Sequence, residues 1–364
     1  MANELGAVHV AIVGGGYVGV ELAKALESSM RVSLIERADA FTHAPAMIRA
    51  MVDPSLLDQA LIPYDRLMSK GQFIKAEATS IDDAGVTLSD GTKVAADYIV
   101  LATGSGNLPA FKSATGDIAG VRTANAAWHR ALVDASSVAI IGAGAVGTEL
   151  AGEIASAMPG KSVSLISSDE ALFPGFPQKL GASLVSKLRA MSVDVILGER
   201  ATELPDGTAP GGGTVTLSSG RTIAADLIVP AVGARLNIGL ADTLADVKRA
   251  ADKRLVVDQW MRPSSLPNVF AAGDVADNGD LMTIVAVSRQ VPWLAKLLKA
   301  VAAGKSVESQ SPYKPWGKAP ILVPLGPKRG SSFLMIATLG DWVTSMMKGR
   351  DLFIAKYRKL LGQS

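Results

Sequence analysis

Three glycines near the start of the chain, Gly14, Gly16 and Gly19, have the GxGxxG spacing that can bind the diphosphate of a dinucleotide. The first allows a tight turn, the second lets a diphosphate approach bare backbone, and the third lets the next helix pack closely on a strand. The N-terminus of that helix offers free N–H groups and a positive partial charge to the phosphates. Glu36 follows and can accept hydrogen bonds from a ribose diol.

The residues around these glycines predict the elements that would position them. The apolar run 8–13 is typical of a strand that is buried on both faces of a parallel sheet. Helical spacing follows in 20–26, and a second strand over 31–35 ends at Glu36. Because strand, turn, helix, strand and terminal acid are in register, we interpret 8–36 as a dinucleotide-binding unit rather than a chance glycine-rich turn.

The same pattern returns further along the chain. A strand over 137–141 leads into a second GxGxxG turn, a helix over 148–155 follows, and another strand covers 162–166. Two such units imply two dinucleotides, which we interpret as one tightly bound flavin and one exchangeable nicotinamide, since electrons must pass between them. The last strand leads into Ser-Ser-Asp at 167–169, so NADH and NADPH both stay open, with Asp169 favouring NADH.

Further strands are expected to end where ligands bind, because ligands lie at the carboxyl edge of a parallel sheet. Residues 98–101 lead into the small-residue turn 102–104, residues 227–232 have the same pattern in the second unit, and 268–272 lead into Gly273-Asp274. Two polar segments are predicted to form inserted β-meanders with tight hairpin turns, and they cover 81–93 and 214–222.

The order GGGYVG, Glu36, LATGS, GAGAVG and FAAGD resembles the flavoproteins of the pyridine nucleotide:disulfide oxidoreductase fold. The chain has no Cys, which sets it apart from the branch that works through a redox dithiol. A closer resemblance is to the apoptosis-inducing-factor-like flavoproteins, and within them to the ferroptosis-suppressor group of NAD(P)H:ubiquinone reductases. It rests on 41–43, Arg49, 313–315 and 348–353.

The resemblance implies an α/β fold with two Rossmann-like domains, one for FAD and one for NAD(P)H, with β-meander insertions and a small C-terminal α+β region. We expect the FAD-binding domain to comprise 1–108 and 258–310, the NAD(P)H-binding domain 109–257, and the C-terminal domain 311–364.

The resemblance also implies roles for individual residues. FAD would be bound by the first glycine turn, strand ends and an arginine, namely Gly14, Gly15, Gly16, Tyr17, Val18, Glu36, Arg49, Ala78, Ala102, Thr103, Gly104 and Asp274. NAD(P)H would be bound by the second turn and a following acid, namely Gly142, Gly144, Ala145, Val146, Gly147 and Glu149. The catalytic candidates are Lys348 beside the isoalloxazine, Glu149 near the nicotinamide and His43 as a proton donor.

Four of these residues have plainer alternatives. Arg49, Lys348 and Glu149 could be solvated surface charges, since most charged side chains are exposed. His43 could be structural, because an ordinary imidazole pKa does not by itself indicate catalysis.

The function that the resemblance implies is FAD-dependent NAD(P)H:quinone oxidoreduction, with a quinone such as ubiquinone as the acceptor. Two alternatives stay open: a reductase of a small iron–sulfur protein, and a redox sensor that binds NADH. The net charge of +2 gives no reason to expect nucleic acid. No metal site is expected, because Cys is absent and the three His are far apart in the sequence.

The sequence also bears on membranes. No uncharged apolar run reaches the roughly 18 residues of a spanning helix. The start has neither a basic n-region nor Gly at position 2, so we expect neither secretion nor myristoylation. Basic and apolar residues alternate with helical spacing over 348–361, which could rest on a membrane or pack on the protein. We therefore expect a cytoplasmic protein that could be peripheral on a membrane, and the sequence allows a homodimer.

Overall fold

The first dinucleotide unit is built on a parallel sheet. The computed structural model describes residues 8–363 except 107, 109 and 113–115. The strands have the order β19-β9-β1-β2-β5, and all pairs are parallel. Their bounds are β1 (His9–Val13), β2 (Arg31–Glu36), β5 (Gln72–Lys75), β9 (Tyr98–Leu101) and β19 (Val269–Ala271).

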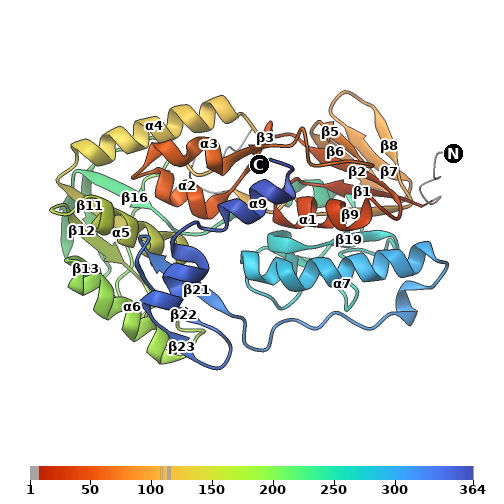
Figure 1. Cartoon of the computed structure of the whole chain (residues 1–364). Coiled ribbons are helices and arrows are strands. Elements are labelled where there is room, and N and C mark those ends of the chain that lie inside the picture. Colours follow the sequence, from red (N-terminus) through yellow and green to blue (C-terminus); the bar gives the residue numbers. More distant parts are fainter. Residues whose placement is uncertain (1–7, 107, 109, 113–115, 364) are drawn as a thin grey trace.

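Alternate residues of β1 enter two different cores, which is why the whole strand is apolar. Val10 and Ile12 pack with α1 (Tyr17–Leu26) and α7 (Ile284–Ala302) on one face of the sheet. Ala11 and Val13 pack with the antiparallel meander on the other face. Figure 1 shows this arrangement, with β19 and α7 completing the first unit although they follow the second unit in sequence. The meander consists of β6 (Ala78–Asp82), β7 (Gly85–Leu88) and β8 (Lys93–Ala95).

The second unit repeats this design with a parallel sheet in the order β13-β12-β11-β16. The predicted meander is wrong here, because the structure has a two-stranded hairpin that adds one isolated bridge, Ala201↔Leu217. The segment 205–213, rich in glycine and proline, lacks the side chains that pack on a third strand. The unit comprises α4 (Ile118–Asp134), β11 (Ser137–Ile141), α5 (Ala145–Ala157), β12 (Ser162–Ile166), α6 (Gln178–Ala190), β13 (Val193–Ile196), β14 (Gly213–Thr216), β15 (Thr222–Ala225) and β16 (Leu227–Pro230).

Short elements join the two units. The strand pair β10 (Ser105–Gly106) and β17 (Arg235–Leu236) links the turn after β9 with the turn after β16. The segment between β2 and β5 carries β3 (Ala40–Thr42), α2 (Ala44–Ala50), α3 (Leu57–Ala60) and β4 (Leu61–Pro63), and a further pair is β18 (Leu255–Val256) with β20 (Ala276–Asp277). Within the described residues no helix is long and apolar enough to cross a membrane.

The C-terminal region is the expected α+β element. An antiparallel sheet, a π-helix and two short helices lie against both units, below and between them in Figure 1. They are β21 (Ile321–Leu325), β22 (Arg329–Phe333), β23 (Thr338–Leu339), α8 (Asp341–Thr344), the π-helix η5 (Ser345–Gly349) and α9 (Ile354–Leu360).

The apolar face of α9 packs on the protein. Tyr357 and Leu361 are fully buried in the core of the first unit, whereas Ile354 belongs to the core that includes the second unit. The alternative in which this helix packs internally therefore holds, and its apolar stripe is not available to a membrane. Elsewhere in the region Trp342 and Met346 are exposed, by 71% and 52%.

Candidate functional site

The two glycine turns have nearly the same backbone. The φ angles of Gly14 and Gly142 are 107° and 105°, a region that favours glycine. Gly16 and Gly144 are the N-caps of α1 and α5, with no side-chain cap. A Cβ built on either would meet no atom within 4 Å in the part of the chain that the structure describes. Each turn therefore leaves open space at an uncapped helix N-terminus, which is what a bound diphosphate requires.

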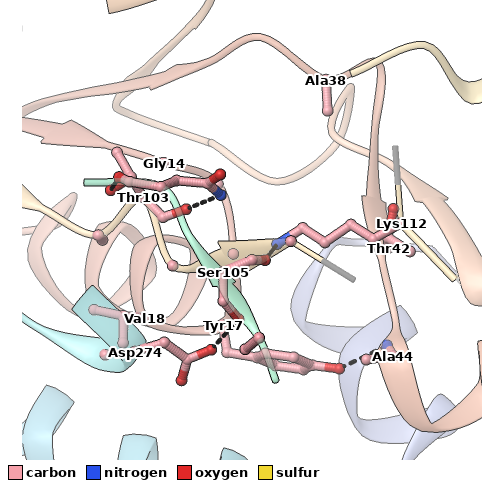
Figure 2. A pocket seen from close by; sticks show the side chains of 18 of the residues that line it. Gly14, Tyr17, Val18, Ala38, Thr42, Ala44, Thr103, Ser105, Lys112 and Asp274 are labelled. Atoms are coloured by element: carbon pink, nitrogen blue, oxygen red, sulfur yellow. Dashed lines mark hydrogen bonds between the residues drawn. The ribbon is translucent and has the colours of Figure 1, made fainter. Parts of the chain in front are cut away.

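Both turns open onto one cavity of about 1020 Å³. That volume is at the upper end of the usual range for ligand sites. Of the predicted residues, those that line it are Gly14, Gly15, Gly16, Tyr17, Val18, Glu36, Ala78, Ala102, Thr103, Gly104, Gly144, Ala145, Val146 and Asp274. Figure 2 shows part of this wall, where Gly14 and Tyr17 from the first turn lie near Thr103 and Asp274 from other strand ends. The predicted residues outside the lining are Arg49, His43, Gly142, Gly147, Glu149 and Lys348.

Glu36 lies at one end of the first turn. Its Oε2 accepts a hydrogen bond from the Gly15 N–H at 2.5 Å, and its Oε1 accepts one from the Ala38 N–H at 2.8 Å. The Tyr64 hydroxyl donates to the Gly15 carbonyl at 2.8 Å and packs by its ring on Phe73. Both groups fix the turn, and the sequence interpretation missed Tyr64 because no motif marks it.

Asp274 lies at the carboxyl edge of the sheet, as predicted. Its Oδ2 accepts from the Ser105 hydroxyl at 2.6 Å. The preceding Gly273 N–H donates at 2.8 Å to the amide oxygen of Gln290 on α7, whose amide nitrogen donates to buried Asp280 at 3.1 Å. The Asp274 turn is thus positioned by α7, and it aims a carboxylate into the cavity, where hydroxyls of a ligand could donate to it.

Thr103 connects the first unit to the second. Its hydroxyl donates to the Asn237 carbonyl at 2.6 Å, and the Asn237 amide donates back to the Thr103 carbonyl at 3.0 Å. Together with the β10–β17 pair, this contact holds the two glycine turns on the same cavity. The residues present therefore fit a pair of dinucleotides: two carboxylates, those of Glu36 and Asp274, line the cavity, and both glycine turns leave open space.

Three buried charges and the partly buried Lys348 form a cluster where the first unit, α5 and the C-terminal region meet. Arg49 binds Glu153 through both carboxylate oxygens, with distances of 2.8–3.0 Å, and donates to the Gly349 carbonyl at 2.7 Å. Lys348 binds Glu149 at 2.6 Å and donates to the Leu322 carbonyl at 3.2 Å. Glu149 and Glu153 are one helical turn apart on α5, and each is 3% exposed.

This burial rules out the plain alternative of solvated surface charges for Arg49, Lys348 and Glu149. Burial raises the pKa of both Glu149 and Glu153, whereas Lys348 and Arg49 respectively oppose that shift. The π-helix η5 contributes Lys348 and the Gly349 carbonyl, and such helices are frequent at functional sites. The predicted contact of Arg49 with a flavin stays a prediction, as does the role of Lys348 beside the ring.

His43 is fully buried, and both nitrogens of its ring form hydrogen bonds. Nε2 donates to the Leu352 carbonyl at 2.6 Å, so Nδ1 is the acceptor and takes the Tyr17 hydroxyl hydrogen at 3.1 Å. Tyr17 in turn accepts from the Ala44 N–H at 2.9 Å. Leu352 and Phe353 both have left-handed φ angles, of 55° and 65°. This geometry favours the structural alternative for His43, which holds a strained turn in place.

Acid should destabilise the protein through His43. Burial lowers the pKa of His43 to about 4 from the ordinary 6.5. Between these pH values the unfolded chain binds the proton and the native one does not, so the free energy of unfolding falls as pH falls, by about 3 kcal/mol over the window. Urea unfolding between pH 4.5 and 7 measures this slope.

The variant His43→Gln keeps a donor for the Leu352 carbonyl but cannot titrate. We expect it to flatten the slope, with a remainder from His9, whose pKa burial also lowers. An unchanged slope in His43→Gln would contradict the assignment of this pH dependence to the buried imidazole.

Two Rossmann-like units that share one cavity define an oxidoreductase that uses FAD and NAD(P)H. The chain belongs to the pyridine nucleotide-disulphide oxidoreductase family, which matches residues 9–61 and 64–292. It is similar to apoptosis-inducing factor homolog B of Dictyostelium discoideum, with 31% identity over 96% of this chain and 95% of that protein. It is also 28% identical to ferroptosis suppressor protein 1 of Homo sapiens, over 99% of this chain and 98% of that protein.

Solved structures share the fold at low sequence identity. A ferredoxin reductase from Rhodopseudomonas palustris, of the CYP199A2 system, superposes with a TM-score of 0.63 and 20% identity over 89% of this chain and 87% of that one. The covalent putidaredoxin reductase–putidaredoxin complex gives a TM-score of 0.64 and 22% identity over 89% of this chain and 83% of that one. These likenesses confirm the predicted fold class.

Proposed function

We propose that the protein is an FAD-dependent NAD(P)H:quinone oxidoreductase. When bound, FAD supplies the two-electron chemistry: it accepts a hydride from NAD(P)H and passes two electrons to the quinone, while water supplies the protons. The chain's own residues bind and orient the two nucleotides and shield the reacting rings.

The observation that carries the proposal is that one thiol-free cavity receives both glycine turns. Without cysteine, electrons cannot pass to a protein dithiol, so the acceptor must reach the flavin itself. The lining of the cavity also includes Met282, Ile284 and Val287, and Met282 is 46% exposed. An apolar wall that is open to the outside suits a flat lipophilic acceptor.

Lys348 and Glu149 are part of the proposal as residues near the reacting rings. Glu149 follows Ala145 and Val146, which line the cavity, by one turn of α5 and so adjoins them on the helix. The Lys348–Glu149 pair thus lies directly behind the second glycine turn, where it can fix the place of a nicotinamide.

The membrane contact in this proposal uses Trp342, Met346 and Met347, because these exposed side chains lie on α8 and the π-helix rather than on α9. An aromatic and two thioethers on one short segment suit a lipid interface from which a quinone could be taken.

Steady-state turnover tests the proposal. With FAD bound, we expect rapid multiple turnovers of NADH or NADPH with a short-chain quinone and no protein acceptor. With a long-chain quinone in lipid vesicles, Trp342→Ser is expected to slow turnover while leaving the rate with the short-chain quinone unchanged.

Two outcomes would replace the proposal. Turnover that requires a ferredoxin-type protein would favour reduction of an iron–sulfur partner, a function consistent with the fold shared with the putidaredoxin reductase complex. A single slow reduction that leaves a persistent long-wavelength band would favour an NADH-binding redox sensor.

A further inference from the structure

Lys112 is a cation in the cavity wall that neither the motifs nor the resemblance indicated. It borders the same cavity as the two glycine turns. Its Nζ donates to the Ser105 carbonyl at 2.7 Å. Among the described residues no carboxylate oxygen lies within 4.0 Å of Lys112 Nζ, so this ammonium forms no ion pair with them. Within the described part of the chain, the ammonium therefore has one acceptor, the Ser105 carbonyl, for its three hydrogens.

A partly buried ammonium in this state is costly without an anion. Burial lowers the pKa of Lys112, and the charges of Glu36 and Asp274 act in the opposite direction. Lys112 thus lies in the field of both carboxylates without touching either. By the resemblance, Glu36 would bind the adenosine ribose of FAD, and Asp274 would form a hydrogen bond with its ribityl chain.

The hydrogen bonds connect Lys112 to this end of the site. The Ser105 carbonyl accepts from Lys112 while the Ser105 hydroxyl donates to Asp274. Figure 2 shows the Lys112 side chain extending toward Ser105, with Asp274 and Tyr17 beyond it and Gly14 on the far side of Ser105. In FAD the diphosphate lies between the ribose and the ribityl chain, and it is the anionic part of that molecule.

We propose that the Lys112 ammonium is a ligand of the FAD diphosphate and works together with the first glycine turn. The turn offers backbone N–H groups and a helix N-terminus, which carry partial charge, and Lys112 adds a full positive charge. The proposal depends on FAD lying at the first turn and not on the identity of the electron acceptor.

Flavin binding to the apoprotein tests the proposal, with the quenching of flavin fluorescence as the readout. We expect Lys112→Met to weaken FAD binding by about 10-fold to 100-fold, the usual range for a charge-assisted hydrogen bond. Riboflavin lacks the diphosphate, so its affinity should change by less than about twofold. Lys112→Arg should keep most of the FAD affinity.

Salt gives a second readout. FAD affinity should fall with ionic strength in the wild type, and this fall should be shallower in Lys112→Met because one cation–anion contact is gone. The matched control is Lys93→Met in the first unit, where an exposed lysine pairs with Asp82 on the surface. It should change neither affinity nor the salt dependence.

Folding is measured on the same proteins. Because Lys112 is partly buried and forms no ion pair among the described residues, apo Lys112→Met should melt at or above the wild-type temperature. Added FAD should raise the melting temperature of this variant less than it raises that of the wild type. Wild-type FAD affinity in Lys112→Met would overturn the proposal. So would an equal loss of FAD and riboflavin, which would show that Lys112 shapes the cavity. If Lys112→Met does not fold, Lys112→Gln is measured against the same two outcomes.

Discussion

Gly16→Val is expected to give a folded protein that does not retain FAD. The φ of Gly16 is −72°, which any residue can adopt, and a Cβ there would meet no atom of the described residues within 4 Å. The new side chain would therefore leave the fold alone and fill the space where the diphosphate would lie. The measurements are the visible absorption of the purified protein, the FAD released on denaturation, and the thermal melt of the apoprotein.

The equivalent change in the second turn, Gly144→Val, separates the two nucleotides. It meets the same open space, so the protein should fold and keep its yellow colour, but NADH and NADPH should no longer bleach the flavin under anaerobic conditions. Gly175→Val is the matched control, since Gly175 lies in equally open space outside both turns. This variant should keep FAD and should still be bleached by the nicotinamide nucleotides. Loss of FAD from Gly144→Val with retention in Gly16→Val would reverse the assignment of the two units.

Arg49→Ala is expected to lower the free energy of unfolding by about 3–5 kcal/mol, because it leaves the buried Glu153 carboxylate without its partner. Urea unfolding of the FAD-loaded protein measures the loss. Arg122→Ala removes an arginine from an exposed pair with Asp58 and should cost less than about 1 kcal/mol. The double variant Arg49→Met, Glu153→Met should recover much of the loss, since no unpaired charge is then buried.

The same variant distinguishes the two roles considered for Arg49. If Arg49→Ala released FAD with little change in stability of the apoprotein, Arg49 would be a flavin ligand, as the resemblance implies. If stability falls as expected in the apoprotein as well, the principal role of Arg49 is to join α2 to α5 and to the Gly349 carbonyl.

The glycine turns and the strand ends could be predicted because their signals are local. In each unit the strand, turn and helix are contiguous, and the first and third glycines of each turn are required by backbone geometry within that turn. The built Cβ of Gly19, for example, would collide with the Gly14 carbonyl. Asp274 could also be predicted from a local signal, because its place at the sheet edge follows from the strand that precedes it.

The partners of charged side chains could not be predicted in this way. Arg49 and Glu153 are 104 residues apart in sequence, and Lys348 and Glu149 are 199 residues apart. Nothing in the spacing of either pair indicates a contact. Lys112 lies outside any motif, so only the folded chain brings it to the cavity.

The sequence could not decide where the C-terminal helix packs, and the reason is different. A basic helix with an apolar stripe is equally suited to a lipid surface and to a protein core, since both remove the stripe from water. The choice is made by Tyr357, whose hydroxyl donates to Glu21 on α1 at 2.8 Å and whose ring stacks on Phe41. That arrangement exists only after α1 and β3 have come together.

The near identity of the two glycine turns has a consequence for selectivity. Since Gly16 and Gly144 differ by only a few degrees in φ and ψ, neither turn can distinguish one adenine dinucleotide from the other. Discrimination must come from the far ends of the two nucleotides, the flavin and the nicotinamide, because the adenosine ribose that Glu36 would bind belongs to both. ADP, the fragment common to both nucleotides, should accordingly compete at both turns, and a change of nucleotide preference would be engineered at those ends rather than in the glycines.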